Sequence, residues 1–213
     1  MRWTVVVPVK AAPVAKSRLR SATHSAHAHT QLTAAIRSDT LAAASDAASV
    51  GRVLIVTDLQ QATVPAPPGS HLLVQRSPGL NNALAEAAGY AARRWPDDGI
   101  ALLVGDLPSL RAADLDAALS RAARHGVAFV ADAEGVGTTL LTARPGLAPH
   151  PRFGSGSAAR HAESATAVEA PAGLRRDVDT DADLVAAVAL GVGPATAAVL
   201  GIDPGHGSRA VAG

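Results

Sequence analysis

The chain has 213 residues and no cysteine, so it is long enough for one large domain but excludes disulfides, thiolate catalysis and sulfur-ligated metals. Aromatic residues make up only 2% of the chain against 48% hydrophobic residues overall, so the core must be built from alanine, valine and leucine. The formal net charge is +1 and the arginines are scattered, which provides no basic face for nucleic acid.

Apolar strands and helices alternate along the chain. Strands are expected at residues 3–9, 52–57, 71–75, 100–105, 127–132 and 138–142, and extended segments at 167–170 and 174–178. Helices are expected at 30–48, 81–95 and 112–125, in a short segment that ends at Ser164, and from the cap Thr180 to Leu190. This alternation predicts an α/β fold, a single Rossmann-like domain with a mostly parallel sheet and helices on both faces. We expect the domain to cover residues 1–202 and a flexible tail to follow at 203–213.

The N-terminus enters the first strand directly. No charged leader segment precedes that strand, and no apolar run approaches the roughly 20 residues that span a bilayer. We therefore expect a cytoplasmic protein that does not bind a membrane. The oligomeric state is left open, a homo-oligomer included.

Lysine is rare in this chain, because 17 of the 19 basic residues are arginine. The two lysines, Lys10 and Lys16, both lie in the loop after the first strand. Ligands of an open α/β sheet bind beyond the carboxyl ends of its strands, so a ligand is expected at this loop. A lysine ammonium is a compact point charge that suits phosphate. The loop is therefore a candidate phosphate site, and two solvated surface charges are the simpler alternative.

Three aspartates are candidate metal ligands. Asp106 directly follows the apolar strand at 100–105, and Asp177 and Asp179 stand two apart in a segment expected to be extended, where both side chains share a face. Carboxylates held close together are costly unless a cation neutralises them, and oxygen ligands at strand ends hold Mg²⁺ beside substrate phosphates. The alternative is a turn aspartate at 106 and solvated charges at 177 and 179.

Two glycine-containing loops offer backbone amides. Residues 135–139 lack the third glycine of a dinucleotide fingerprint, and a strand rather than a helix follows them. Residues 153–157, with the sequence Phe-Gly-Ser-Gly-Ser, precede a helix whose N-terminus is suited to an anion. An ordinary helix cap explains this second loop equally well. A third segment, 79–83, opens a helix with two asparagines that are either caps or contacts to a nucleotide base.

The basic loop, the aspartates and the amide-rich loops fall at one edge of the predicted sheet. The chain has no P-loop sequence and no nucleophile motif. A basic loop beside a carboxylate metal site fits metal-assisted nucleotidyl transfer.

Short motifs between residues 9 and 180 resemble, in the same order, the 2-phospho-L-lactate/phosphoenolpyruvate guanylyltransferase family of coenzyme F-420 biosynthesis, which has the nucleotide-diphospho-sugar transferase fold (GT-A-like). The motifs are residues 9–10 with 15–19, 78–81, 105–108, 137–138, 152–154 with 157–161, and 177–180. The chain departs from this family at Ser77, where an acidic residue is common, and at Ala133, where arginine is usual.

The resemblance implies transfer of GMP from GTP to phosphoenolpyruvate or 2-phospho-L-lactate, with release of pyrophosphate. Phosphoenolpyruvate is the acceptor we expect first. For GTP, the resemblance implies binding of the nucleotide by Lys10, Lys16, Arg18 and Asn81, with the base near Asn81.

The resemblance also implies which residues bind the acceptor and the metal ions and which act in catalysis. The acceptor would be bound by Thr138, Gly154 and Ser157, and two Mg²⁺ ions would be held by Asp106, Asp177 and Asp179. Lys16, Arg18 and Asp106 would act in catalysis, since two anions must meet and their charge must be neutralised. Two other functions remain open: a nucleotidyltransferase of the same fold with a molybdopterin or sugar-phosphate acceptor, and a nucleotide-binding regulator without catalytic activity.

Overall fold

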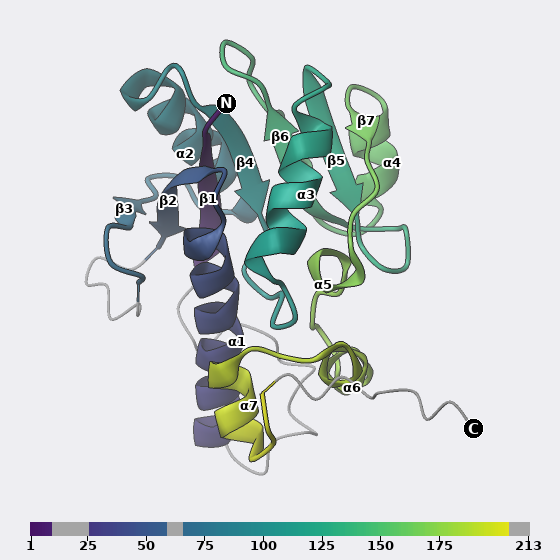
Figure 1. Cartoon of the computed structure of the whole chain (residues 1–213). Helices are drawn as coiled ribbons and strands as arrows, with labels where there is room; N and C mark the ends of the chain where they lie inside the picture. The colour runs from purple at the N-terminus through teal and green to yellow at the C-terminus, as the bar shows by residue number, and fades with distance from the viewer. Residues whose placement is uncertain (10–25, 59–65, 205–213) are drawn as a thin grey trace.

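The computed structural model describes residues 1–9, 26–58 and 66–204, so Lys10, Lys16 and Arg18 lie outside the described residues. The described chain forms one seven-stranded sheet with the order β3-β2-β1-β4-β6-β5-β7 (Figure 1). Its strands are β1 (Trp3–Val9), β2 (Val50–Thr57), β3 (His71–Val74), β4 (Gly99–Leu103), β5 (Val127–Ala131), β6 (Thr138–Ala143) and β7 (Thr166–Ala167). The helices are α1 (Ala26–Asp46), α2 (Leu80–Arg94), α3 (Ala112–Ala122), α4 (Ser157–Ala162), α5 (Ala172–Arg175), α6 (Asp181–Leu190) and α7 (Pro194–Leu200).

The sheet is mostly parallel, as the sequence predicts. β1 pairs in parallel with β2 and β4, and β2 with β3, whereas β6 is antiparallel to both β4 and β5. Two reversals place β5 in the same direction as β4. The carboxyl ends of β1, β4 and β5 therefore meet at one edge of the sheet.

The central strand β1 is buried on both faces, which explains why it is a continuous apolar run. Val5, Val7 and Val9 pack in a core with residues of α1 and α3, including Leu41 and Leu115. Residues on the opposite face, Val6 among them, pack in a second core with residues of α2 and α4. Helices thus cover both faces of the sheet, and Figure 1 shows α1 and α3 on the same side of it. The predicted fold class is confirmed.

The C-terminal third differs in detail from the prediction. Residues 174 and 175 were expected to be extended, but they belong to the four-residue helix α5, which follows Pro171 and buries Leu174 completely. A further helix, α7, begins with Pro194 after the predicted last helix. It packs with α6 against the first half of α1 in a third core that includes Leu32, Ile36 and Ala197. Local propensity favoured an extended segment, and burial of Leu174 against the main core overrides it.

Within the described ranges, the helices are too short or too polar to cross a bilayer.

Helix α1 holds the loop that carries Asp106. The backbone N–H of Leu107 donates to Thr40 Oγ1 over 2.9 Å, and the same hydroxyl donates to the carbonyl of Ile36 at 3.0 Å. Thr33, seven residues earlier, donates in the same way to the carbonyl of His29 at 2.9 Å. Both threonines are buried, but a backbone N–H of the Asp106 loop depends on Thr40.

We predict that Thr40→Val destabilises the protein more than Thr33→Val. The first change leaves the buried N–H of Leu107 without its partner, which typically costs about 1–3 kcal/mol, whereas the second removes only a bond from a side chain to a carbonyl of its own helix. Urea unfolding of both variants and the wild type measures the difference. Equal losses of unfolding free energy in the two variants would contradict this anchoring role.

Candidate functional site

Asp106 lies where the ends of two strands meet. It follows β4 after Val104 and Gly105, and a Cβ atom on Gly105 would stand 3.1 Å from the carbonyl oxygen of Pro8 in β1. The carbonyl of Asp106 accepts a hydrogen bond from the N–H of Val178 at 3.1 Å. This bond brings Asp106 next to the segment that contains Asp177 and Asp179, although about 70 residues separate them in the chain. The structure therefore places the three predicted metal ligands in the same region. Of the three, only Asp177 belongs to the group of carboxylates that lie within 4.8 Å of one another among the described residues.

The crowding of negative charge is clearest at Asp177. Burial of its carboxyl group raises the pKa to about 7, and the charges of Asp106, Asp179 and Asp132 add to this shift. Asp177 is half-buried and Asp179 is exposed, so the cluster opens towards solvent on one side. A carboxyl group in these surroundings remains ionised at neutral pH most readily when a cation is bound beside it.

Two acidic residues absent from the sequence-based set also belong to this cluster. Asp132, Glu134 and Asp177 each place one carboxylate oxygen within 4.8 Å of the other two. The carboxylate of Asp132 accepts hydrogen bonds from the N–H groups of Val136 and Gly137, at 2.8 and 2.6 Å. Asp132 directly follows β5, so the rule of parallel strand ends that singled out Asp106 applies to it equally.

Positive charges border the acidic cluster. Arg176 pairs with Glu134 at 2.6 Å and reaches Asp183 at 3.5 Å. Arg37 of α1 is half-buried, and burial lowers the pKa of its guanidinium while the nearby charge of Asp106 opposes that shift. The position of Arg37 depends on the packing of α1 against the Asp106 loop, so no local motif in the sequence indicates it.

The second predicted loop, residues 153–157, is held by Asn81 at the start of α2. The side-chain NH₂ of Asn81 donates to the carbonyl of Phe153 at 3.1 Å, and the N–H of Phe153 donates to Asn81 Oδ1 at 2.8 Å. The amide thus forms a two-bond clamp across 72 residues of chain. A contact between Asn81 and guanine stays a prediction.

The carbonyl groups of this loop are directed to one guanidinium. Arg160 donates to the carbonyls of Arg152, Gly154 and Ser155, and its shortest bond, to Ser155, is 2.6 Å. Gly154 has φ 115° and Gly156 has φ 71°, backbone conformations that favour glycine. Because the carbonyls are occupied, the loop offers mainly N–H and O–H donors to a ligand, which suits an anion.

The three predicted acceptor residues lie together. Ser157 Oγ is 3.2 Å from Thr138 Oγ1, and the N–H of Ser157 donates to the carbonyl of Gly154 at 3.0 Å. The N–H of Ala158 donates to the carbonyl of Val136 at 3.0 Å. The turn that Asp132 stabilises therefore also supports the start of α4. This contact connects the acidic cluster to residues 153–157, the amide loop.

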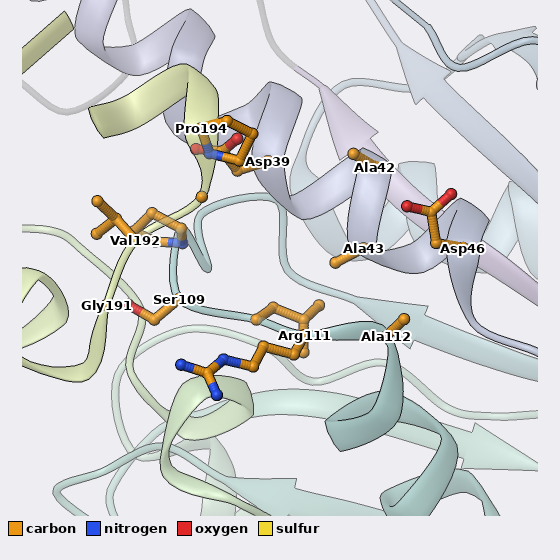
Figure 2. Close-up of a pocket in the computed structure, with 13 residues that line it drawn as sticks. Asp39, Ala42, Ala43, Asp46, Ser109, Arg111, Ala112, Gly191, Val192 and Pro194 are labelled. Carbon is orange, nitrogen blue, oxygen red and sulfur yellow. The ribbon is translucent and has the colours of Figure 1, made fainter. Parts of the chain in front are cut away.

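A cavity of about 300 Å³ lies beside the loop that follows Asp106, between α1, the start of α3 and the connection from α6 to α7 (Figure 2). Figure 2 shows Asp39 next to Pro194, where its carboxylate accepts bonds from the N–H groups of Ala195 and Thr196 at 3.0 and 2.8 Å. None of the predicted site residues that fall within the described ranges lines this cavity. The Asp39 carboxylate therefore stabilises the start of α7, which is a structural role.

The fold is shared with solved structures of other proteins. A crystal structure from Desulfovibrio desulfuricans G20 titled as a nucleotide-diphospho-sugar transferase is similar with a TM-score of 0.64 at 17% identity, covering 86% of this chain and 85% of that one. The structure of a 4-diphosphocytidyl-2C-methyl-D-erythritol synthase is similar with a TM-score of 0.55 at 10% identity, covering 88% of this chain and 97% of that one. At these identities the likeness concerns the fold alone.

Sequence comparison identifies the family. Residues 3–196 match the family model described as "Guanylyl transferase CofC like", and the chain belongs to that family. A phosphoenolpyruvate guanylyltransferase from Thermomonospora curvata is 44% identical over 93% of this chain and 89% of its own length. One from Salinispora arenicola is 45% identical over 98% of both chains.

We predict that Asp177 makes the metal-free protein less stable as the pH rises. Its pKa in the folded state is about 7 against an ordinary value of 3.8, so the folded state binds the proton more tightly and loses that advantage between these two values. Relative to Asp177→Asn, the wild type should therefore lose stability as the pH rises from about 4 to about 7.

Thermal unfolding in EDTA at several pH values measures this difference. Asp97→Asn removes the same charge from an exposed position and serves as the control. A constant gap between wild type and Asp177→Asn over this pH range would show that the pKa of Asp177 is not raised.

Proposed function

We propose that this protein transfers GMP from GTP to phosphoenolpyruvate and releases pyrophosphate, as a step of coenzyme F-420 biosynthesis. The support is the family membership and the set of relatives named phosphoenolpyruvate guanylyltransferase, at 40–46% identity. The structural observation that carries the proposal is the position of the acidic cluster beside an amide loop rich in hydrogen-bond donors. A nucleotidyl transfer between two phosphates requires both, because two anions must be brought into contact.

The residues present fit a divalent metal ion. Asp106, Asp177 and Asp179 provide hard oxygen ligands, and the charges of Asp106 and Asp179 add to the effect of burial in raising the pKa of Asp177. We propose that these three residues hold Mg²⁺, as two ions. When bound, Mg²⁺ supplies positive charge where the acceptor phosphate meets the α-phosphate of GTP.

In the proposed reaction, separate groups of residues bind the acceptor and the phosphates of GTP. A phosphate oxygen of the acceptor attacks the α-phosphorus of GTP, the bond to the bridging oxygen of pyrophosphate breaks, and pyrophosphate leaves. No general base is needed, because the attacking phosphate is already ionised at neutral pH. Thr138, Gly154 and Ser157 hold the acceptor, and Lys10, Lys16 and Arg18 hold the phosphates of GTP. Lys16 and Arg18 also stabilise the charge that develops on pyrophosphate.

The proposal is tested by mass spectrometry of the reaction product. The purified protein is incubated with Mg²⁺, with GTP, ATP, CTP or UTP, and with one acceptor: phosphoenolpyruvate, 2-phospho-L-lactate, 3-phosphoglycerate, a sugar phosphate or a molybdopterin. We expect a guanylylated product and pyrophosphate, with phosphoenolpyruvate used fastest. Phosphoenolpyruvate and phospholactate differ little in volume, so we expect a preference rather than exclusive use. If product forms only with a sugar phosphate or a molybdopterin acceptor, the protein is a different nucleotidyltransferase and the proposal is wrong. Nucleotide binding without turnover would indicate a regulator.

We predict that Asp106→Asn lowers kcat by roughly 100-fold or more with phosphoenolpyruvate, because a neutral amide is a poor ligand for Mg²⁺ and leaves developing charge unbalanced. Circular dichroism and the thermal midpoint check that the variant is folded. Asp97→Asn again serves as the control for a lost surface charge. A near-normal rate of Asp106→Asn in Mg²⁺ would refute the metal assignment.

We also predict that Lys16→Ala raises the KM for GTP and that Lys16→Arg restores it only in part, because the planar guanidinium has a different reach from the ammonium. Steady-state rates at varied GTP and saturating phosphoenolpyruvate test both variants. If neither variant changes the kinetic parameters, Lys16 is a solvated surface charge.

A further inference from the structure

His161 is a buried titratable residue to which the proposed reaction assigns no role. Only 1% of its surface is exposed, and its ring lies 5.2 Å from that of Phe153 and 6.0 Å from that of Phe129, measured between centroids. Both ring nitrogens have polar partners. Nε2 is 3.0 Å from the backbone nitrogen of Arg152, and Nδ1 is 2.8 Å from Thr138 Oγ1.

These two contacts determine where the imidazole proton lies. A backbone N–H can only donate, so Nε2 must accept the bond from Arg152 and carries no proton. Burial, with the charges of Arg160 and Arg152, lowers the pKa of His161 to about 4, so the ring is neutral at pH 7. A neutral imidazole has its proton on one nitrogen. Nδ1 therefore carries it and donates to Thr138 Oγ1.

The direction of this bond constrains the two hydroxyl groups beside it. Thr138 Oγ1 accepts from His161, and it shares one further hydrogen bond with Ser157 Oγ at 3.2 Å. The two hydroxyls have two protons but only one bond between them. Whichever group donates in that bond, one hydroxyl proton remains to be donated to another atom. The chain of bonds from Arg152 through His161 thus has a fixed polarity and ends in a donor.

We propose that His161 is a positioning residue which orients the hydroxyls of Thr138 and Ser157 as donors to an oxyanion of the acceptor. The inference rests on the proposed function, because that function places a small phosphorylated carboxylate at these two residues. The neighbouring loop has the same bias, since Arg160 occupies its carbonyl groups. His161 acts through Thr138 and does not itself touch the acceptor.

A purely structural role is the competing explanation. In that case the important contact is the one from Arg152 to Nε2, which fixes the chain just before the amide loop. Two substitutions separate the roles, because an asparagine amide reaches the position of Nδ1 and a glutamine amide reaches that of Nε2. His161→Asn keeps a donor for Thr138, whereas His161→Gln keeps an acceptor for Arg152.

The test compares KM for phosphoenolpyruvate, KM for GTP and kcat in both variants. We expect His161→Gln to raise the KM for phosphoenolpyruvate by about tenfold, the effect of losing one hydrogen bond, and to leave the KM for GTP unchanged. His161→Asn should have a KM for phosphoenolpyruvate much closer to that of the wild type. The reverse order, with glutamine close to wild type and asparagine impaired, would assign His161 to the Arg152 contact and overturn the proposal.

Thr138→Val provides a second test in which the histidine stays in place. It should raise the KM for phosphoenolpyruvate at least as much as His161→Gln, because it also removes the hydroxyl group of Thr138. Adding His161→Gln to it should cause little further change, because the contact from His161 is already lost. Independent, additive effects would overturn the proposal. An unchanged KM for phosphoenolpyruvate in Thr138→Val would overturn it even if no His161 variant folds.

Calorimetry with phosphoenolpyruvate and Mg²⁺ distinguishes this inference from the proposed function. If the wild type forms no product with any nucleotide and acceptor, the function fails. A weaker binding of phosphoenolpyruvate by His161→Gln than by His161→Asn would still support the orientation of the hydroxyls, and equal binding by the two would reject it.

Discussion

The accumulation of carboxylates at the end of β4 and β5 is the constraint on which the site depends. Asp106 and Asp132 follow these strands, and the backbone bond from Val178 to Asp106 holds Asp177 close enough for the charges of both to act on it. Like charges that lie close together destabilise the fold, so other contacts must hold these segments in place. Thr40 anchors the Asp106 loop, and Arg175 donates to the carbonyls of Ala131 and Asp132 at 3.1 and 2.8 Å. The scaffold therefore maintains an arrangement of charge that a bound cation would stabilise.

The antiparallel strand β6 begins between the acidic cluster and the amide loop. The turn between β5 and β6 is closed by Asp132, and a Cβ atom on Gly137 would stand 2.3 Å from the Asp132 carboxylate, so a larger residue there would displace this carboxylate. Thr138 begins β6 directly after this turn. A parallel strand in this place would need a long crossover and could not put Thr138 six residues after Asp132. The reversed strand explains how Asp132 of the acidic cluster and Thr138, a proposed acceptor contact, come from one short stretch of sequence.

Residues at strand ends could be predicted from the sequence, and residues placed by tertiary packing could not. Apolar runs identify β1 and β4, so the position of Asp106 follows from the order of the elements. Asp132 obeys the same rule, but the strand expected at 127–132 includes it, whereas β5 ends at Ala131. Arg37, the clamp from Asn81 to Phe153 and the buried His161 depend on contacts between elements far apart in the chain. Helix α5 was missed since burial of Leu174 outweighs a weak local preference.

The clamp at Asn81 bears on how the two substrates are held relative to each other. An asparagine amide has two N–H groups and two lone pairs on its oxygen, and Phe153 uses one of each. One donor and one acceptor remain, which is the pattern needed to contact the edge of a base. The role in GTP binding implied by the family resemblance is therefore compatible with the observed contact. A guanine bound there would be connected through one side chain to the loop that we propose to hold the acceptor, so misplacement of either substrate would disturb the geometry of the other.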